Sequence, residues 1–344
     1  MALVEQIANM AAMVREKFNS LTPRVLPSGG SAGQVLTKAS AADYAATWQT
    51  PSGGGGGSSD PLDLAMTDVA APAANTIRLY REEIAGKSML AVRGSSGVGY
   101  PVQASMAHKP IATWNPPGNA TTVPGVNGMP AMTVTGFTAT ARTIAATNRL
   151  TRTRRIGYVT AATAGAVGQF RANAAQYTIG DASGLGGFTF SIRFAITDTA
   201  PVSDARMFVG MKTSTTPTNV DPFTLTNCIG IAQVGGSNSL FLICCGASIV
   251  GASQTLLPAA FDASDTTALY ELTIHSPRFE SKVYWSVTRL DTGDVASDEI
   301  AGDAGTDFPG TTTLLCAPWC YRTNNTTALA VAMDFAPVYI ETDI

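Results

Sequence analysis

The segment at residues 33–48 places the tightest constraint on how this chain can fold. It carries two aliphatic residues, a tyrosine and a tryptophan, and glycine-rich runs at residues 27–31 and 51–57 lie on both sides of it. A segment this short has no core of its own in which to bury apolar surface, which is worth about 25 cal/mol per Å². We therefore expect it to pack against copies of the same chain. The residues expected in that contact are Val35, Leu36, Tyr44 and Trp48.

One amphipathic helix is expected, over residues 2–18. Its apolar residues recur at spacings that place them in a single seam. These residues are Leu3, Ile7, Met10 and Val14. Such a short helix is marginal alone in water, and the glycine-rich run that follows leaves no core nearby. We expect the helix to form a short trimeric coiled coil or to pack against a larger assembly.

The rest of the chain has mainly β-type patterns. Phe188, Phe190 and Ile192 begin an alternation of apolar and polar residues that predicts a strand with one buried face. Many short runs of this kind, separated by turn residues such as Asn324 and Asn325, predict a β-sandwich. Four parts are expected: an N-terminal helix at 1–20, a glycine-rich linker and shaft at 21–60, a small β spacer module at 61–132, and the sandwich at 133–344.

Composition excludes several classes of partner. Only 14% of residues are charged and the formal net charge is −3, so no basic face for a nucleic acid is expected. No apolar run is long enough for a membrane-spanning helix, and no signal peptide is recognised at the N-terminus. The five cysteines are odd in number and form no disulfide framework. We expect them to be small buried hydrophobes, with Cys244 and Cys245 facing opposite sides of a sheet.

The run Gly33-Gln34-Val35-Leu36-Thr37-Lys38, followed by Asp43-Tyr44 and Trp48, resembles the shaft repeat of tailed-bacteriophage fibre and appendage proteins. Residues 75–97 and 111–114 look like the spacer module found after that shaft. Residues 205–211, 217–222, 225–227 and 338–343 are similar to the C-terminal domains of phage tail fibres.

The resemblance implies a homotrimeric fibre with a lectin-like, jelly-roll sandwich at its C-terminal end. It also implies assembly in a bacterial cytoplasm, a final location in the virion, and attachment to tail or capsid proteins through the N-terminus. A host cell-surface glycan is the further partner that it suggests.

No residue pattern predicts catalysis. Three pairs of acids were considered for glycoside cleavage, which needs two carboxyls across a groove. They are Asp262 with Asp265, Asp291 with Asp294, and Asp303 with Asp307. All lie in turn-rich stretches, where Asp commonly bonds its own backbone. His275 is expected to be structural, His108 lies in a loop, and no cofactor or metal is expected.

The densest positive charge lies at residues 142–155. The arginines there are Arg142, Arg149, Arg152, Arg154 and Arg155. They are expected to pair with acidic residues of the same trimer, and the alternative is a basic patch for an acidic glycan. The loop at 213–222 and Asn324 with Asn325 are expected contact regions, but no receptor-binding residue is assigned.

Three functions remain open at this point. The first is a trimeric tail fibre, not an enzyme, whose sandwich contacts a host-surface glycan. The second is a fibre or decoration of the capsid with no essential receptor role. The third is a tailspike that degrades polysaccharide, for which neither long β-helix repeats nor a defined acid pair is present.

Overall fold

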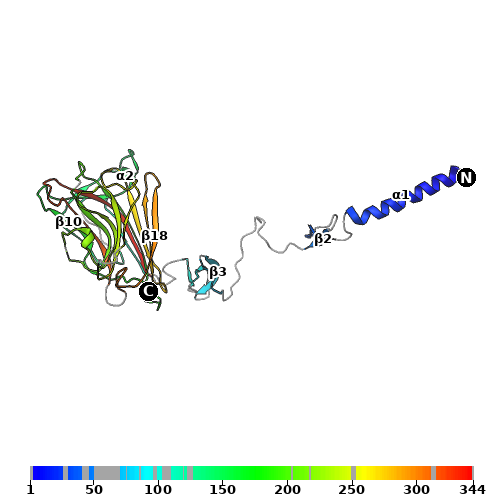
Figure 1. Cartoon of the computed structure of the whole chain (residues 1–344), viewed down its shortest axis with the longest axis horizontal. Coiled ribbons are helices and arrows are strands. Elements are labelled where there is room, and N and C mark those ends of the chain that lie inside the picture. Colours follow the sequence, from blue (N-terminus) through cyan, green and yellow to red (C-terminus); the bar gives the residue numbers. More distant parts are fainter. Residues whose placement is uncertain are drawn as a thin grey trace. The chain divides into compact units, whose positions relative to one another are not determined.

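The computed structural model describes most of the chain. The described residues are 3–25, 30–40, 46–49, 70–74, 76–84, 87–95, 99–102, 110–118, 120–121, 127–202, 204–216, 218–248, 253–310 and 315–342. Residue contacts divide the chain into two units, Met1–Leu64 and Ala65–Ile344. Figure 1 draws the helix and strands of both units.

The first unit begins with helix α1 (Leu3–Val25). An N-terminal helix was expected, but α1 continues well past residue 18. The extension includes Pro23, which has no backbone N–H and, in the last turn, therefore removes one hydrogen bond near the helix end. Every residue whose burial is described, from 3 to 20, is exposed on the single chain.

The shaft segment forms a small antiparallel hairpin. Strands β1 (Val35–Lys38) and β2 (Ala46–Gln49) pair with Leu36 opposite Trp48. The indole of Trp48 lies against Gly30, where a Cβ atom would come within 2.8 Å of the ring. A glycine at this position therefore allows the tryptophan to lie across the backbone.

The second unit contains a small three-stranded antiparallel sheet. Its strands are β3 (Arg78–Ile84), β4 (Lys87–Arg93) and β5 (Gly99–Pro101). Tyr80 and Ala91 face each other across β3 and β4 and are both buried. This sheet occupies the region in which the sequence predicts a spacer module.

The larger part of the second unit is a β-sandwich, as the sequence predicts. One of its two antiparallel sheets, here called the β12 sheet, has its described strands in the order β15 (Ser253–Leu256), β14 (Leu240–Cys245), β13 (Cys228–Gln233), β12 (Arg206–Lys212), β19 (Ala317–Thr323), β10 (Val167–Ala172) and β7 (Met132–Thr135).

The other sheet is called the β11 sheet. Its described strands follow the order β18 (Val295–Ala301), β17 (Lys282–Arg289), β16 (Tyr270–Ser276), β11 (Phe188–Ile196), β20 (Ala332–Thr342), β9 (Ile156–Val159) and β8 (Thr138–Ala141). Two short helices, α2 (Arg149–Arg152) and η1 (Pro222–Thr224), lie in connections between strands.

Strand β6 (Ile111–Trp114) also belongs to the β11 sheet, where it pairs with β20. The sequence resemblance assigns these residues to the spacer module instead. The physical reason for the difference is burial, because Ala112 and Trp114 join the core of the sandwich. The tryptophan is fully buried there and its ring lies 4.8 Å from that of Phe170.

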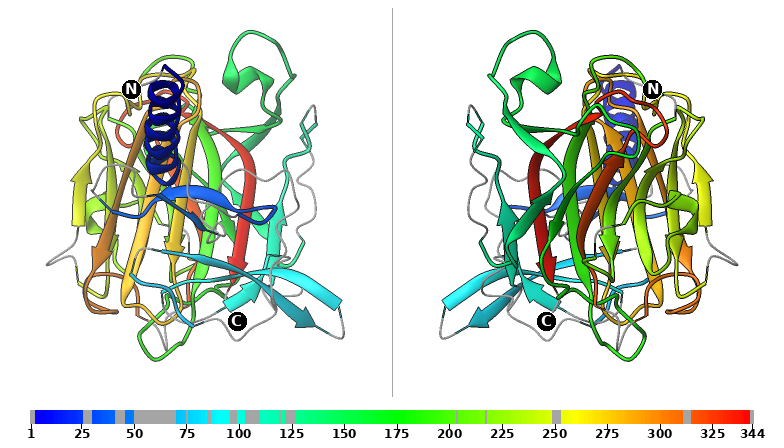
Figure 2. Two further views of the ribbon diagram at one scale, coloured as in Figure 1. Left: turned by 90° about the vertical axis from the view of Figure 1, so that its right-hand side faces the viewer. Right: turned by 90° about the vertical axis from the view of Figure 1, so that its left-hand side faces the viewer.

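The main core lies between the two sheets, which Figure 2 shows from opposite sides. Phe170 of β10 and Phe335 of β20 join the layers, with ring centroids 4.7 Å apart. On β11 the expected alternation is confirmed, since Phe188, Phe190 and Ile192 are buried and the residues between them are half-buried. Among the described residues, no helix combines the length and apolarity needed to cross a bilayer.

Candidate functional site

The residues expected to pack in a trimer lie on α1 and the hairpin of the first unit. Those that the structure describes all expose at least a third of their surface on the single chain. They are Leu3, Ile7, Met10, Val14, Val35, Leu36 and Trp48. Tyr44 lies outside the described residues. These side chains provide apolar surface for packing, and none of them brings polar chemistry to a site.

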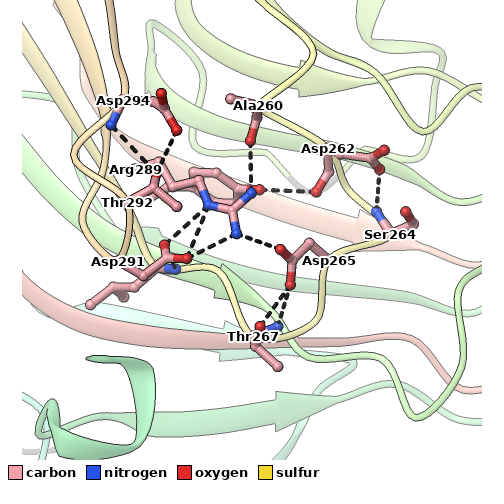
Figure 3. A network of polar contacts seen from close by, with 11 residues as sticks. Ala260, Asp262, Ser264, Asp265, Thr267, Arg289, Asp291, Thr292 and Asp294 are labelled. Carbon is pink, nitrogen blue, oxygen red and sulfur yellow. Dashed lines mark hydrogen bonds and ion pairs between the residues drawn. The ribbon is translucent and has the colours of Figure 1, made fainter. Parts of the chain in front are cut away.

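Two of the three acid pairs meet around one arginine at a corner of the sandwich (Figure 3). Arg289, at the end of β17, places Nη2 at 2.5 Å from Asp265 and at 2.8 Å from Asp291. Its Nη1 donates to the carbonyl of Ala260 at 3.0 Å. Arg289 therefore ties the loop before β16 to the turn after β17.

Glycoside cleavage by two carboxyls needs one of them with a raised pKa, and the pKa of Asp265 is shifted in the opposite direction. Burial raises the pKa of Asp265, but hydrogen bonds from Thr267 and the charge of Arg289 outweigh it and hold the pKa below its ordinary value. The partner acids serve as turn residues, because Asp262 accepts from the backbone N–H of Ser264 and Asp294 accepts from the hydroxyl of Thr292.

The third acid pair forms a turn of its own. The carboxylate of Asp307 accepts the backbone N–H of Asp303 at 2.8 Å, and the N–H of Asp307 donates back to the carbonyl of Asp303 at 2.9 Å. The interpretation of these acids as turn residues agrees with these contacts. Within the described residues, no group of His, Cys, Asp and Glu side chains is arranged to hold a metal ion.

Two arginines of the basic stretch have a buried acidic partner within the same chain. Arg155 Nε lies 2.8 Å from Asp334, and Arg142 Nη2 lies 2.9 Å from the other oxygen of that carboxylate. The hydroxyl of Thr197 donates to it as well. Arg152 is directed back to the carbonyl of Ala146. Arg155, Arg142 and Arg152 are therefore engaged in contacts within the chain. The guanidinium groups that a basic patch for an acidic glycan would need are directed to those partners.

His275 is the histidine that the structure describes. The Nδ1 atom of His275 lies 2.9 Å from the hydroxyl of Thr189, and its ring stacks on Tyr284 with centroids 6.2 Å apart. These neighbours fit the structural role expected for it. His108 lies outside the described residues.

A second apolar layer covers the outer face of the β12 sheet, away from the main core. Its buried residues are Phe208, Leu225, Cys228, Ala232, Ile243, Cys245, Trp319 and Tyr321. A sheet face that is solvated usually carries polar residues at these positions. An apolar outer face therefore requires a cover, and the connection between β12 and β13 supplies it.

That connection, residues 213–227 and here called the cover loop, is tied to the sheet by side chains beneath it. The hydroxyl of Tyr321 donates to the carbonyl of Val220 at 2.7 Å. The amide of Gln169 donates to the carbonyl of Thr218 at 3.2 Å. Asp221 starts helix η1 by accepting the N–H of Phe223. The described residues of the loop, 213–216 and 218–227, thus have a defined conformation over this face.

A pocket of about 280 Å³ opens where the cover loop leaves the end of β12. Val220 and Leu225 give it two apolar walls. The other lining residues carry a hydroxyl or an ammonium group, and they are Lys212, Ser214, Thr216, Thr218, Thr224 and Thr226. None of the lining residues is acidic.

The charge in this pocket is a single half-buried lysine. The Nζ atom of Lys212 lies 5.7 Å from the centroid of the Trp319 ring, a favourable cation–π position. Among the described residues, the ion pairs do not include Lys212. The indole N–H of Trp319 is buried and has no acceptor in the described part of the chain. The pocket therefore offers a cation and hydroxyl donors to an incoming group.

The sequence pointed to part of this pocket and missed the rest. The cover loop contains the residues 213–222 that were expected to make contacts. Lys212 and Trp319 were not singled out, since a lysine at a strand end and a tryptophan in an apolar strand carry no local signal. Asn324 and Asn325 lie beyond the opposite end of β19, where the amide of Asn324 donates to the carbonyls of Thr163 and Leu329.

Comparisons with known proteins found similarity to solved structures alone. No family model matches this chain, and no curated protein matches it. Among solved structures, a peanut lectin with a nine-residue peptide has a TM-score of 0.45 at 12% identity, over 68% of this chain and 97% of that chain. Arcelin-5, a lectin-like defence protein from Phaseolus vulgaris, has a TM-score of 0.44 at 9% identity, over 68% and 98%. Lectin II from Ulex europaeus has a TM-score of 0.43 at 11% identity, over 67% and 98%. Each of these structures is similar to this chain over about two thirds of its length.

Proposed function

We propose that this chain is a fibre protein of a tailed-bacteriophage virion and that its sandwich binds a host-surface glycan in the pocket under the cover loop. The observation that carries the glycan-binding part is the pocket itself. It combines several hydroxyl groups, a lysine and two apolar walls, on a loop tied down at Val220 and Thr218. Preformed pockets with a few polar groups on apolar walls are typical of small-ligand sites.

The fibre part of the proposal rests on the shaft resemblance and on the first unit. The apolar stripe of α1 and the exposed Trp48 and Val35 give a single chain more apolar surface than it can cover. Three copies around one axis would cover it, and three sandwiches on one fibre would raise the avidity of weak glycan contacts. In this proposal the N-terminal region attaches to the virion tail, and the protein acts by binding and not by catalysis.

The pocket favours a particular kind of glycan. A volume of about 280 Å³ is just below the ~300–1,000 Å³ of pockets that enclose drug-sized ligands, so it suits one terminal sugar. A lysine with no acidic residue in the lining favours a sugar that carries a carboxylate, phosphate or sulfate group. The bound group would accept hydrogen bonds from Lys212 and from the loop hydroxyls.

The test is a binding assay of the full-length protein against an array of acidic and neutral oligosaccharides. Charge-assisted hydrogen bonds contribute about 1.5–3 kcal/mol, so Lys212→Gln should weaken binding of acidic sugars roughly tenfold or more. The control is Lys282→Gln, which removes a lysine paired with Glu299 on the β11 sheet and should leave binding unchanged. Equal binding by wild type and Lys212→Gln would contradict the proposed site.

A further inference from the structure

Two cysteines face each other on the outer side of the β12 sheet. The Sγ atoms of Cys228, on β13, and Cys245, on β14, lie 3.8 Å apart. The two residues are direct cross-strand partners and both are buried. Neighbouring Cys244 faces the main core between the sheets, as its place in the strand alternation requires.

The strand register at this pair suits a covalent bond. Next along the ladder, the backbone N–H of Asn227 donates to the carbonyl of Gly246 at 2.7 Å, whereas the N–H of Gly246 donates to the carbonyl of Thr306. Cys228 and Cys245 are directly opposite, and directly opposite residues of an antiparallel pair have Cα atoms about 4.5–5.5 Å apart. That separation lies within the ~4.4–6.8 Å range of disulfide-linked residues. The strands need not move to bring the sulfurs within bonding distance.

The two thiols also differ in acidity. A hydrogen bond from Cys228 lowers the pKa of Cys245 to about 7, despite burial, and backbone N–H groups with the charge of Lys212 act in the same direction. The carbonyl of Leu225 accepts from the Cys245 thiol at 3.0 Å and so favours the protonated form. By contrast, burial raises the pKa of Cys316 to about 12. Cys245 is therefore better suited than Cys316 to react as a thiolate.

The pair is buried next to a residue that lines the pocket. Leu225, whose carbonyl contacts Cys245, lines the pocket together with Thr224 and Thr226. Lys212 lines it as well and precedes the cover loop. The Cys245 sulfur thus lies within hydrogen-bonding distance of a residue of the pocket wall, Leu225.

We propose that Cys228 and Cys245 form an oxidisable pair that a peroxide converts into a cross-strand disulfide beneath the cover loop. The Cys245 sulfur attacks one oxygen of hydrogen peroxide, the O–O bond breaks, and a sulfenic acid and one water form. The Cys228 sulfur then attacks the sulfenic sulfur, the S–O bond breaks, and a second water leaves with the thiol proton. Two thiols and one peroxide give one disulfide and two waters.

This reaction has consequences for the site above. A disulfide leaves Cys245 with no proton to donate, so the Leu225 carbonyl loses its hydrogen bond. The loop retains its ties at Val220 and Thr218. Oxidation thus cross-links two strands under the cover loop. It also releases the carbonyl of Leu225, in the pocket wall, from its hydrogen bond with Cys245.

The experiment compares full-length protein kept in dithiothreitol with protein treated with hydrogen peroxide and then alkylated. Before alkylation, the peroxide-treated protein should be lighter than the reduced protein by two hydrogen atoms. After alkylation, proteolysis without reduction should yield one peptide pair joined at Cys228 and Cys245. Because the bond closes a loop, the treated protein should unfold several degrees higher. Dithiothreitol should reverse both changes.

Two variants act as controls. Cys245→Ser should abolish the mass loss and the thermal shift, whereas Cys316→Ser should retain both, since Cys316 lies in the main core. If either variant fails to fold, alkylation rates of the wild-type thiols provide a second readout, with Cys245 expected to react before Cys316. A peroxide-treated protein without the joined peptides, or with Cys245 oxidised only to sulfinic acid, would overturn the proposal.

Discussion

At the scale of single residues, the sandwich holds a few buried charges in place by pairing them. Asp334 on β20 is almost fully buried and accepts from Arg155, Arg142 and Thr197. Arg155 also donates to the carbonyl of Leu150 in α2. This cluster therefore connects the helix to the sheet. If one member is removed, the others are left as charges without a partner. The resulting loss of folding stability exceeds the stability that the intact cluster contributes.

Asp334→Asn should thus destabilise the sandwich by about 3 kcal/mol. The amide keeps the shape of the carboxylate but leaves two arginines without a counter-charge. Urea unfolding followed by tryptophan fluorescence would measure the change, because Trp114, Trp285 and Trp319 are all in the sandwich. Asp298→Asn, on exposed strand β18, is the matched control and should change stability by less than about 0.5 kcal/mol. Equal effects of the two substitutions would contradict the role given to Asp334.

A second residue-scale prediction concerns acid. The pKa of Asp265 is lower in the folded protein than its ordinary value of 3.8. Such a group contributes stability above that value, and the contribution is lost as pH falls through the folded pKa. Asp265→Asn should therefore be less stable than wild type at pH 7, and the difference should narrow between pH 4 and pH 2 in a series of urea unfolding curves. A difference that stays constant with pH would show that the carboxylate charge is not its cause.

At the scale of elements, the cover loop is the part that converts a plain sheet face into a pocket. It is not a strand or a long helix, so its conformation depends on hydrogen bonds from the sheet to its carbonyls. Tyr321 supplies one from β19 and Gln169 supplies another from β10. Phe223 of η1 packs edge-on against Phe241 of β14, with ring centroids 5.1 Å apart. Three strands therefore anchor one loop.

Tyr321→Phe should loosen that loop without disturbing the sheet. The substitution keeps the ring and removes one hydrogen bond, at a cost of about 1 kcal/mol. Amides at residues 218–226 should exchange faster with deuterium, and amides of β12 and β19 should not. Tyr284→Phe, which removes a hydroxyl bonded to Glu280 on the β11 sheet, should leave exchange in the cover loop unchanged. Unaltered exchange in Tyr321→Phe would mean that this hydrogen bond does not hold the loop.

At the scale of the whole molecule, the two units have different sources of stability. The second unit encloses a core between two sheets, whereas the first has a helix whose described side chains are all exposed. An isolated helix is held only weakly by its own hydrogen bonds in water. We therefore expect α1 to gain its stability from association with copies of itself.

Full-length protein should sediment as a trimer, and the double variant Ile7→Ser and Val14→Ser should sediment as smaller species. Both residues are more than half exposed on the single chain, so their replacement removes apolar surface only from the expected contact. Glu16→Ser, outside the apolar seam, should remain trimeric. The sandwich should stay folded in all three proteins, as judged by tryptophan fluorescence. A monomeric mass for the wild type would exclude the trimer.

Local pattern alone was sufficient for several features of this protein. The alternation at Phe188, Phe190 and Ile192 predicted β11 and its buried face, and the apolar seam of α1 predicted the helix. The arrangement of Cys244 and Cys245 on opposite faces also followed from adjacency. These predictions succeed because the backbone period alone decides which neighbouring side chains share a face.

Only the tertiary structure decided which distant segments meet. It joined β6 to β20 and brought Asp265 and Asp291 to Arg289. It also placed the cover loop over the β12 sheet, with Lys212 above Trp319. None of these contacts has a local signal, because strand pairing across many residues is selected by the burial and hydrogen bonding of the whole sandwich. The sequence therefore predicted only part of the pocket, namely the loop at 213–222. The positions of Lys212 and Trp319 depend on a sheet that forms from segments far apart in the chain.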